Sequence, residues 1–448
     1  MQFILTKRVW LTPLILFQGY LTFVLILYFI GPWPWGNQNL AKLLAFLVAA
    51  QIAIGLGYWA GWQKLCRTAA AQTNEDRAES ITKSRAFFDI AFWIYLVLLI
   101  PTALSRAGTA FPNVIEGINY TGAVYNDNYE RNSLGNIFVL VEYFRMLLSP
   151  ALIAFFPLLI IFWRDISKTK RVIGIAMIIY FTAIYISIGV NKGIADIILT
   201  LPWLIFIVHY AGSNGLRIPR WLFYSILLFI FALFMIFFGQ GQEQRDGNVG
   251  LSGLFNSGLT IIRADSGWLG DIMNDQARII YESITRYLTS GYYALSLSFD
   301  IEHPSTYGIG NSMFFSRNVD FIFGTDYFTT QSIPGILEAK QGFPQFALWH
   351  SIYPWLASDV GFIGSLLVVG FFSYLLSLSW GLSIITLSHK WIAMFSLMII
   401  LFFYIPANNQ IFQSGETAIG FILVGLWIFF DKSRGSSRAR RKKSATAS

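Results

Sequence analysis

Residues 221–238 read WLFYSILLFIFALFMIFF, a stretch without a single charged side chain. A bilayer core about 30 Å thick is crossed by a helix of about 20 predominantly apolar residues. Runs of similar length and character recur along the whole 448-residue chain. The sequence therefore predicts an all-α polytopic membrane protein.

The overall composition agrees with this fold class. Apolar residues make up 55% of the chain, aromatic residues 17% and charged residues 12%, whereas a soluble protein carries about 25% charged residues. These values exclude a soluble enzyme, a secreted disulfide scaffold and a disordered protein. The only cysteine, Cys66, also excludes an internal disulfide, a cysteine cluster for zinc and a CxxC redox site.

The hydropathy pattern predicts ten membrane spans. They cover residues 9–30, 40–59, 87–104, 137–163, 172–188, 194–210, 221–238, 360–382, 391–405 and 418–430. The fifth and sixth spans are separated only by a tight turn at residues 189–193. With ten spans, most of the 32 Lys and Arg residues fall on one side, which the positive-inside rule assigns to the cytoplasm.

Both termini are then cytoplasmic, and the first span is a retained anchor. The net charge of +8 reflects this orientation and not nucleic-acid binding. The basic, Ser-rich tail from residue 431 is expected to be disordered and held near anionic lipid headgroups.

Two segments lie on the outer side. Residues 105–136 form a polar loop after the third span, and residues 239–359 form a much larger segment between the seventh and eighth spans. A loop of that length is usually functional and carries secondary structure of its own. Residues 277–298 read as a helix within it.

Arginines occur in the large outer segment, on the side where the positive-inside rule least expects them. A guanidinium group donates two hydrogen bonds at once to a phosphate. Solvent-exposed ion pairs are the alternative explanation for each arginine taken singly. The candidate phosphate ligands here are Arg263, Arg278, Arg286 and Arg317.

Two further basic residues lie at or within the membrane. Arg145 falls in the fourth predicted span, so it is expected to face either a polar cavity or Glu142, three residues earlier. Lys192 lies in the turn before the sixth span, at a helix N-terminus, where anions are attracted. A lysine that snorkels to the interface is the alternative.

Two residues of the outer segment are candidate general bases. His350 is flanked by aromatic side chains and is otherwise a structural histidine, and Asp359 directly precedes the eighth span, which it could cap instead. The motifs HExxH, GxSxG and the P-loop do not occur in the sequence. Without a phosphate loop, the chain alone is not an ATP-driven pump.

Three motifs, in this order along a chain with one long late outer loop, resemble the bacterial oligosaccharide repeat-unit polymerases, the Wzy-type O-antigen polymerases. The first motif is GVNKG at residues 189–193, where Lys192 stands in the place of the family's arginine. The second is YLTSGYY at residues 287–293. The third is YPWLASDVGFIG at residues 353–364, which is similar to an Asp-x-Gly-x-x-Gly entry to the last helices.

This resemblance implies a C-type glycosyltransferase fold in the bacterial inner membrane, with its active site facing the periplasm. The enzyme would transfer a growing glycan from undecaprenyl diphosphate to a new lipid-linked repeat unit, with inversion at the anomeric centre and without metal or cofactor. Its partners would include a flippase and a chain-length regulator, but no nucleic acid. In this reading six basic residues hold the diphosphate, and His350 or Asp359 serves as the base. The six are Arg145, Lys192, Arg263, Arg278, Arg286 and Arg317.

Other functions remain open at this point. An O-antigen ligase, or another lipid-linked sugar transferase, would share the fold class and the donor. A lipid-oligosaccharide flippase or transporter usually has short loops and two similar halves, and neither feature is evident in this sequence. An assembly protein would not need arginines spread through an outer segment.

Overall fold

The computed structural model describes residues 7–36, 38–133, 138–245 and 253–445. Within them, seven helices are long and apolar enough to cross a membrane. They are α1 (Lys7–Ile30), α2 (Leu40–Ala70), α3 (Asn74–Ala107), α8 (Lys168–Ser187), α9 (Lys192–Ala211), α10 (Arg220–Arg245) and α16 (Ile352–Thr386). The chain is therefore an all-α, multi-pass membrane protein.

The remaining predicted spans fall on shorter or broken helices. The predicted span 137–163, whose first residue lies outside the described ranges, is a bent pair, α6 (Val139–Leu147) and α7 (Ser149–Ile161), which meet at 69°. Pro150 follows the break at Leu148; proline has no backbone N–H to donate to the carbonyl oxygen four residues earlier, and its ring clashes with that carbonyl. The last two spans correspond to α17 (His389–Tyr404) and the first half of α18 (Gly415–Ala445). The number of crossings, ten, stays a prediction.

Two element ends differ from expectation. Helix α16 begins at Ile352, eight residues before the predicted span, and is broken at Gly361, whose φ of 69° is a conformation that glycine adopts without a Cβ clash. Helix α18 continues to Ala445, where the sequence predicted a disordered tail. The extension is rich in Arg and Lys, which are good helix formers, and contains no proline.

The large segment between α10 and α16 is mostly helical. The predicted helix at residues 277–298 corresponds to α12. The segment consists of β1 (Leu254–Asn256), β2 (Ile261–Arg263), α11 (Gly267–Ile272), α12 (Asp275–Ser298), α13 (Met313–Phe323), α14 (Tyr327–Thr330) and α15 (Ile333–Gln341). The two strands form an antiparallel hairpin in which Leu254 pairs with Arg263. The polar loop after α3 holds α4 (Val114–Asn119) and α5 (Thr121–Ser133), and η1 (Gln410–Phe412) connects α17 to α18.

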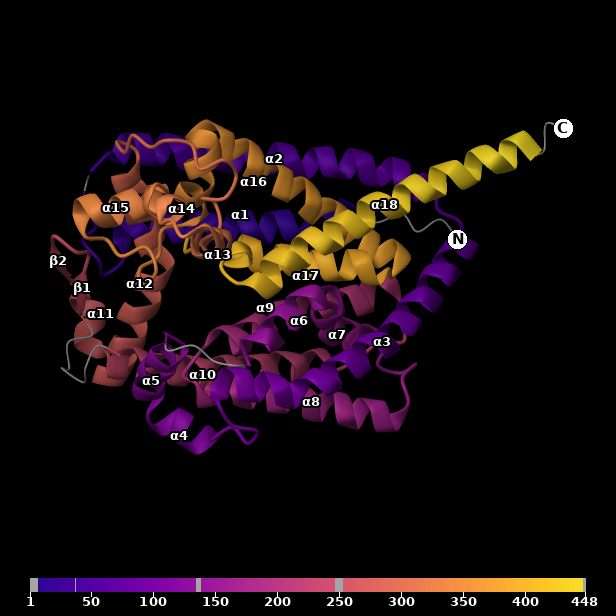
Figure 1. The fold of residues 1–448 in the computed structure, drawn as a ribbon, viewed down its shortest axis with the longest axis horizontal. Helices are drawn as coiled ribbons and strands as arrows, with labels where there is room; N and C mark the ends of the chain where they lie inside the picture. Colours follow the sequence, from indigo (N-terminus) through magenta and orange to yellow (C-terminus); the bar gives the residue numbers. More distant parts are fainter. Residues whose placement is uncertain (1–6, 37, 134–137, 246–252, 446–448) are drawn as a thin grey trace.

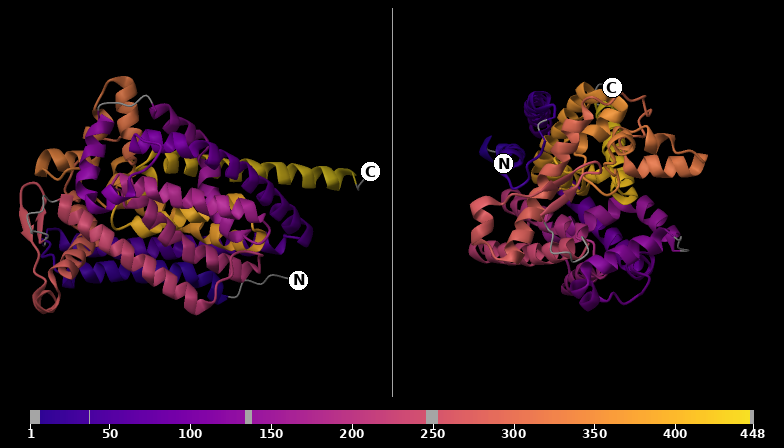
Figure 2. Two further views of the ribbon diagram at one scale, coloured as in Figure 1. Left: turned by 90° about the horizontal axis from the view of Figure 1, so that it is seen from below. Right: turned by 90° about the vertical axis from the view of Figure 1, so that its left-hand side faces the viewer.

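The long helices run side by side along the longest axis of the molecule (Figure 1). Helices α1, α2, α16, α17 and α18 form one group, and α3 and α6–α10 form the other (Figures 1 and 2). Helix α1 begins, and α18 ends, at one end of the bundle. The opposite end, which we call the loop end, carries the hairpin and α11–α15.

Helix α12 ties the loop end to the bundle. The indole nitrogens of Trp33 and Trp35, in the connection between α1 and α2, donate to the Glu282 carbonyl oxygen and the Thr289 hydroxyl, each at 2.9 Å. Residues 289–298 are buried along the whole second half of the helix. At Gly291 an added Cβ would lie 2.1 Å from the Pro406 carbonyl oxygen. Only a glycine permits this close approach.

Helices α2 and α16 cross in contact through small residues. An added Cβ at Gly57 would lie 1.9 Å from the carbonyl oxygen of Gly370, and one at Gly61 would lie 2.6 Å from the Cβ of Ser377. Two small residues four positions apart let helix backbones approach closely in membranes. The pair therefore fixes the central contact between these two long helices.

We expect Gly57→Ala to destabilise the protein by about 1–3 kcal/mol, because the methyl group has no room against a backbone carbonyl. Thermal unfolding of the detergent-solubilised protein measures the change. Gly19→Ala in α1 is the matched control, since nothing lies within 4 Å of an added Cβ there. Equal melting temperatures for the two variants would contradict the tight crossing.

Candidate functional site

A cavity of about 990 Å³ lies among α9, α10, α12 and α17, next to η1. It extends along α10 from Phe238 to Tyr224, about 21 Å of helix at a rise of 1.5 Å per residue. Its walls are predominantly apolar. The α10 residues that line it are Tyr224, Leu227, Leu228, Phe231, Phe234, Met235 and Phe238.

The cavity is open on the side of α10. Leu228 is 69% exposed and Phe231 is 47% exposed, although both side chains line the cavity. Exposed apolar side chains in the middle of a membrane helix face lipid. The cavity can therefore be reached from the hydrocarbon region of the bilayer.

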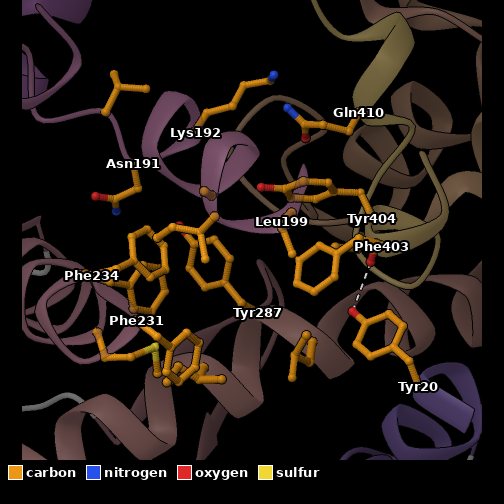
Figure 3. A pocket seen from close by; sticks show the side chains of 18 of the residues that line it. Tyr20, Asn191, Lys192, Leu199, Phe231, Phe234, Tyr287, Phe403, Tyr404 and Gln410 are labelled. Carbon is orange, nitrogen blue, oxygen red and sulfur yellow. Dashed lines mark hydrogen bonds between the residues drawn. The ribbon is translucent and has the colours of Figure 1, made fainter. Parts of the chain in front are cut away.

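The end of the cavity near η1 is polar. Lys192, at the first position of α9, Gln410 and Gln413 line it together with the ring of Tyr404. Figure 3 shows Lys192 and Gln410 along one edge and Phe231 and Phe234 on the opposite side. The Lys192 ammonium group lies 2.5 Å from the Asp196 carboxylate, one turn further along α9. An apolar channel with one polar end that carries a cation is suited to bind an amphiphile with an apolar chain and an anionic headgroup.

Two glycines determine the turn that presents Lys192. Gly189 has a φ of 65°, and an added Cβ would lie 2.2 Å from the Thr121 carbonyl oxygen. At Gly193 an added Cβ would lie 2.3 Å from the ring of Tyr185. The predicted tight turn is thus packed on both sides, which holds Lys192 at the cavity wall.

A cluster of four charged side chains lies beside this turn. Arg145 is only 2% exposed, and its guanidinium group donates to Glu416 at 2.6 and 3.1 Å and to the Thr102 hydroxyl at 2.8 Å. Arg106 donates to both carboxylate oxygens of Glu142, at 2.9 and 3.1 Å, and to Glu416 at 3.2 Å. The two arginines and two glutamates balance in charge.

This cluster borders the cavity through one aromatic residue. Arg106 donates to the Tyr185 hydroxyl at 2.8 Å, and Tyr185 packs against Gly193 in the turn that carries Lys192. The cluster therefore braces α3, α6, α8 and α18 around the polar end of the cavity.

We compared the chain with family models, curated proteins and solved structures. None of them matches it.

The outer-segment arginines do not converge on the cavity. Arg263 is exposed on β2, and Arg317 is exposed on α13, where it stacks over the Phe346 ring at 5.2 Å. Arg278 is half-buried and pairs with the exposed Asp275 at 3.0 Å. Arg286 is half-buried on α12, between cavity residues Ile284 and Leu288, and donates to the Leu254 carbonyl oxygen at 3.4 Å.

Of the six predicted diphosphate ligands, Lys192 alone is on the cavity wall. Arg145 is linked to the turn that carries Lys192 through Glu416, Arg106 and Tyr185. The sequence offered the choice between a cavity and a pair with Glu142 for Arg145. The structure gives Glu416 as its main partner, and Glu142 is 3.8 Å away. The roles of all six in binding stay predictions.

His350, a predicted base, is fully buried away from the cavity lining. Its Nδ1 lies 2.9 Å from the Leu348 carbonyl oxygen, and its ring packs edge-on against Phe343. Burial lowers the pKa of His350 to about 4. A base that weak removes a hydroxyl proton poorly near neutral pH, so this position fits a packing role.

The buried His350 predicts a pH dependence of stability. Its pKa falls from 6.5 to about 4 on folding, so between these values the unfolded chain binds a proton that the folded protein does not. Stability is therefore lost as the pH falls from about 6.5 to 4, by about 3 kcal/mol for this group.

Melting temperatures of the wild type and His350→Gln, measured from pH 7.5 to 4.5, test this. The wild type should lose its advantage in melting temperature over the variant as the pH falls, because only the wild type carries the buried histidine. Parallel curves would show that the histidine does not titrate in this way.

Asp359, the other predicted base, binds the loop before α13. Its carboxylate accepts hydrogen bonds from the backbone of Gly308 and Asn311, each at 2.9 Å, from the Asn311 side chain at 2.7 Å, and from the Thr306 hydroxyl. It does not cap the helix that follows the break in α16, because both of its carboxylate oxygens accept hydrogen bonds from this loop. Its position predicts an anchoring role.

Sequence reasoning missed Arg106 and Glu416. Each lies two residues beyond the end of a predicted span, so each was counted with a loop. Their position directly beside a span could have marked them as candidates for buried ion pairs, because charged residues there either snorkel to the interface or pair inside the bundle.

Proposed function

We propose that the protein is a membrane glycosyltransferase that polymerises lipid-linked oligosaccharide repeat units. The observation that supports it is the cavity of about 990 Å³, apolar along α10 and polar at Lys192. A polyprenyl chain would lie along the α10 wall. The diphosphate would lie at the polar end, at the N-terminus of α9.

In the reaction, the bond between the anomeric carbon and the diphosphate oxygen breaks, and its electron pair stays on the leaving diphosphate. A sugar hydroxyl of the second lipid-linked unit forms the new bond and releases its proton. Charge grows on the diphosphate as the bond breaks, and a fixed cation is most effective at that position. Lys192 is that cation in this proposal, and Arg286, whose neighbours Ile284, Tyr287 and Leu288 line the cavity, is the second candidate.

Polymerase activity, as distinct from other lipid-linked glycan transfers, rests on the three motifs at residues 189–193, 287–293 and 353–364. Two of them border the cavity: the first contains Lys192, and the second contains Tyr287 and Leu288. The third contains Asp359 and the break at Gly361. In this proposal the protein lies in the bacterial inner membrane, with the loop end in the periplasm.

A clean deletion in the native host tests the function, with the surface glycan and the lipid-linked glycans separated on gels. We expect a ladder that collapses to a core bearing one repeat unit. Long polymer that accumulates on the lipid carrier, with none on the core, would identify a ligase. Repeat units trapped on the cytoplasmic face would identify a flippase and overturn the proposal.

A further inference from the structure

Helix α13 ends in three consecutive exposed apolar residues. Phe321, Ile322 and Phe323 are 85%, 71% and 75% exposed. Large apolar side chains do not gather on the surface of a protein without a partner or an apolar environment. We propose that this tip of α13 inserts into the bilayer surface at the loop end.

The position of α13 places it at the level of the membrane boundary. The Ser312 hydroxyl, at its N-cap, donates to the Phe412 carbonyl oxygen at 2.8 Å, and Phe314 packs against Gly415, the first residue of α18. Figure 1 shows α13 beside the end of α17 and the start of α18, whereas α11 lies farther out. Helix α13 thus starts where a membrane helix starts.

The direction of α13 carries its tip away from the bundle. Figure 2 shows this helix reaching sideways, across the direction of the long helices. A helix that lies in the interface plane buries its apolar side chains about 5–10 Å into the boundary between headgroups and acyl chains. The tip therefore extends sideways beyond the bundle, as a helix in the interface plane would.

The tip cannot turn inward to bury its apolar side chains. Helix α13 ends at Gly324 in the left-handed conformation, with a φ of 63°. The buried Asp320 accepts hydrogen bonds from the backbone of Phe328 at 3.1 Å and Thr329 at 2.8 Å, at the start of α14. This connection fixes the orientation of the last turn of α13.

The chemistry of the exposed face favours lipid over a protein partner. Arg317 is exposed one turn before Phe321, with its guanidinium group over Phe346. Aromatic side chains with a nearby arginine are typical of membrane interfaces, where the arginine reaches the lipid phosphates. At its other end, α13 packs against the membrane helices: Phe314 and Met146 of α6 both lie within 3 Å of where a Cβ on Gly415 would be.

Lipid contact is tested with one probe at two sites. In a Cys66→Ser background, Ile322→Cys and Ile272→Cys are each labelled with a bimane fluorophore and reconstituted into phosphatidylcholine–phosphatidylglycerol nanodiscs. The two isoleucines are equally exposed, at 71%, and Ile272 lies on α11, farther from the membrane helices. A fraction of the lipids carries a nitroxide just below the headgroup.

We expect the nitroxide lipid to remove roughly half of the emission at position 322 and little at position 272, because the tip would lie about 5–10 Å into the lipid boundary. Aqueous iodide should quench the two sites in the opposite order. Equal iodide quenching at both sites would overturn the proposal. Protection of position 322 from both quenchers, with energy transfer between labelled copies, would assign the tip to a contact between two copies and overturn it as well.

Discussion

Replacing Lys192 by alanine is expected to reduce polymer synthesis by about 10²–10³-fold, the usual effect of removing one fixed group that stabilises transition-state charge. Lys192 is the one predicted diphosphate ligand on the cavity wall. Gel analysis of the polymer made by the variant in a deletion strain measures the loss. Lys192→Arg should keep most of the activity, because it retains the positive charge at the turn.

The matched control is Lys42→Ala. Lys42 also pairs with an aspartate at the loop end, Asp300, at 2.6 Å, but both side chains are mostly exposed. This variant should make polymer of normal length. Full activity of Lys192→Ala at normal membrane levels would show that Lys192 does not stabilise the leaving diphosphate.

The second large effect concerns stability. Glu416→Gln should lower the free energy of unfolding by about 3–5 kcal/mol, because it leaves a buried cation without its compensating charge. Glu416 accepts from both Arg145 and Arg106, and Glu142 alone cannot neutralise two guanidinium groups. Thermal unfolding in detergent, followed by the loss of the folded peak on size-exclusion chromatography, measures the change.

Glu79→Gln is the control for this change. Glu79 pairs with Lys83 at 2.6 Å on an exposed helix surface, where ion pairs contribute little to stability. The double variant Glu416→Gln with Arg145→Met should recover part of the loss, because a buried pair replaced as a unit leaves no unpaired charge. A Glu416→Gln protein as stable as the control would show that the cluster is hydrated.

The membrane helices could be predicted because a long apolar run has few alternatives to a membrane helix. The break at Leu148 and the early start of α16 did not follow from hydropathy, because the apolar runs continue through both places. Residues 352–358 precede the predicted span as a buried helix, and Gly361 then redirects the chain. Hydropathy does not distinguish a buried helix from a spanning one.

The candidate site was predictable only in part. The turn around Lys192 has a sequence signal, two glycines flanking a lysine before an apolar run. The cavity has no sequence signal, because α9, α10, α12 and α17 come together only in the folded protein. The side of the membrane on which an arginine lies does not show whether it reaches a cavity, and Arg263 and Arg317 are exposed on the surface. The pairing of Arg145 with Glu416 joins residues 271 positions apart, so local sequence gives no sign of it.

The close packing of Gly291 against Pro406 has a consequence for biosynthesis. Helix α12 rests on Pro406 and on Ser351, whose backbone nitrogen in turn donates to the Ala407 carbonyl oxygen at 2.9 Å. Ser351 emerges from the ribosome about fifty residues after the end of α12 at Ser298, and Pro406 more than a hundred residues after it. The cavity is therefore completed only when synthesis has passed residue 413, the last residue of its lining. A nascent chain stopped at residue 400 would contain α9, α10 and α12 and still lack an assembled site.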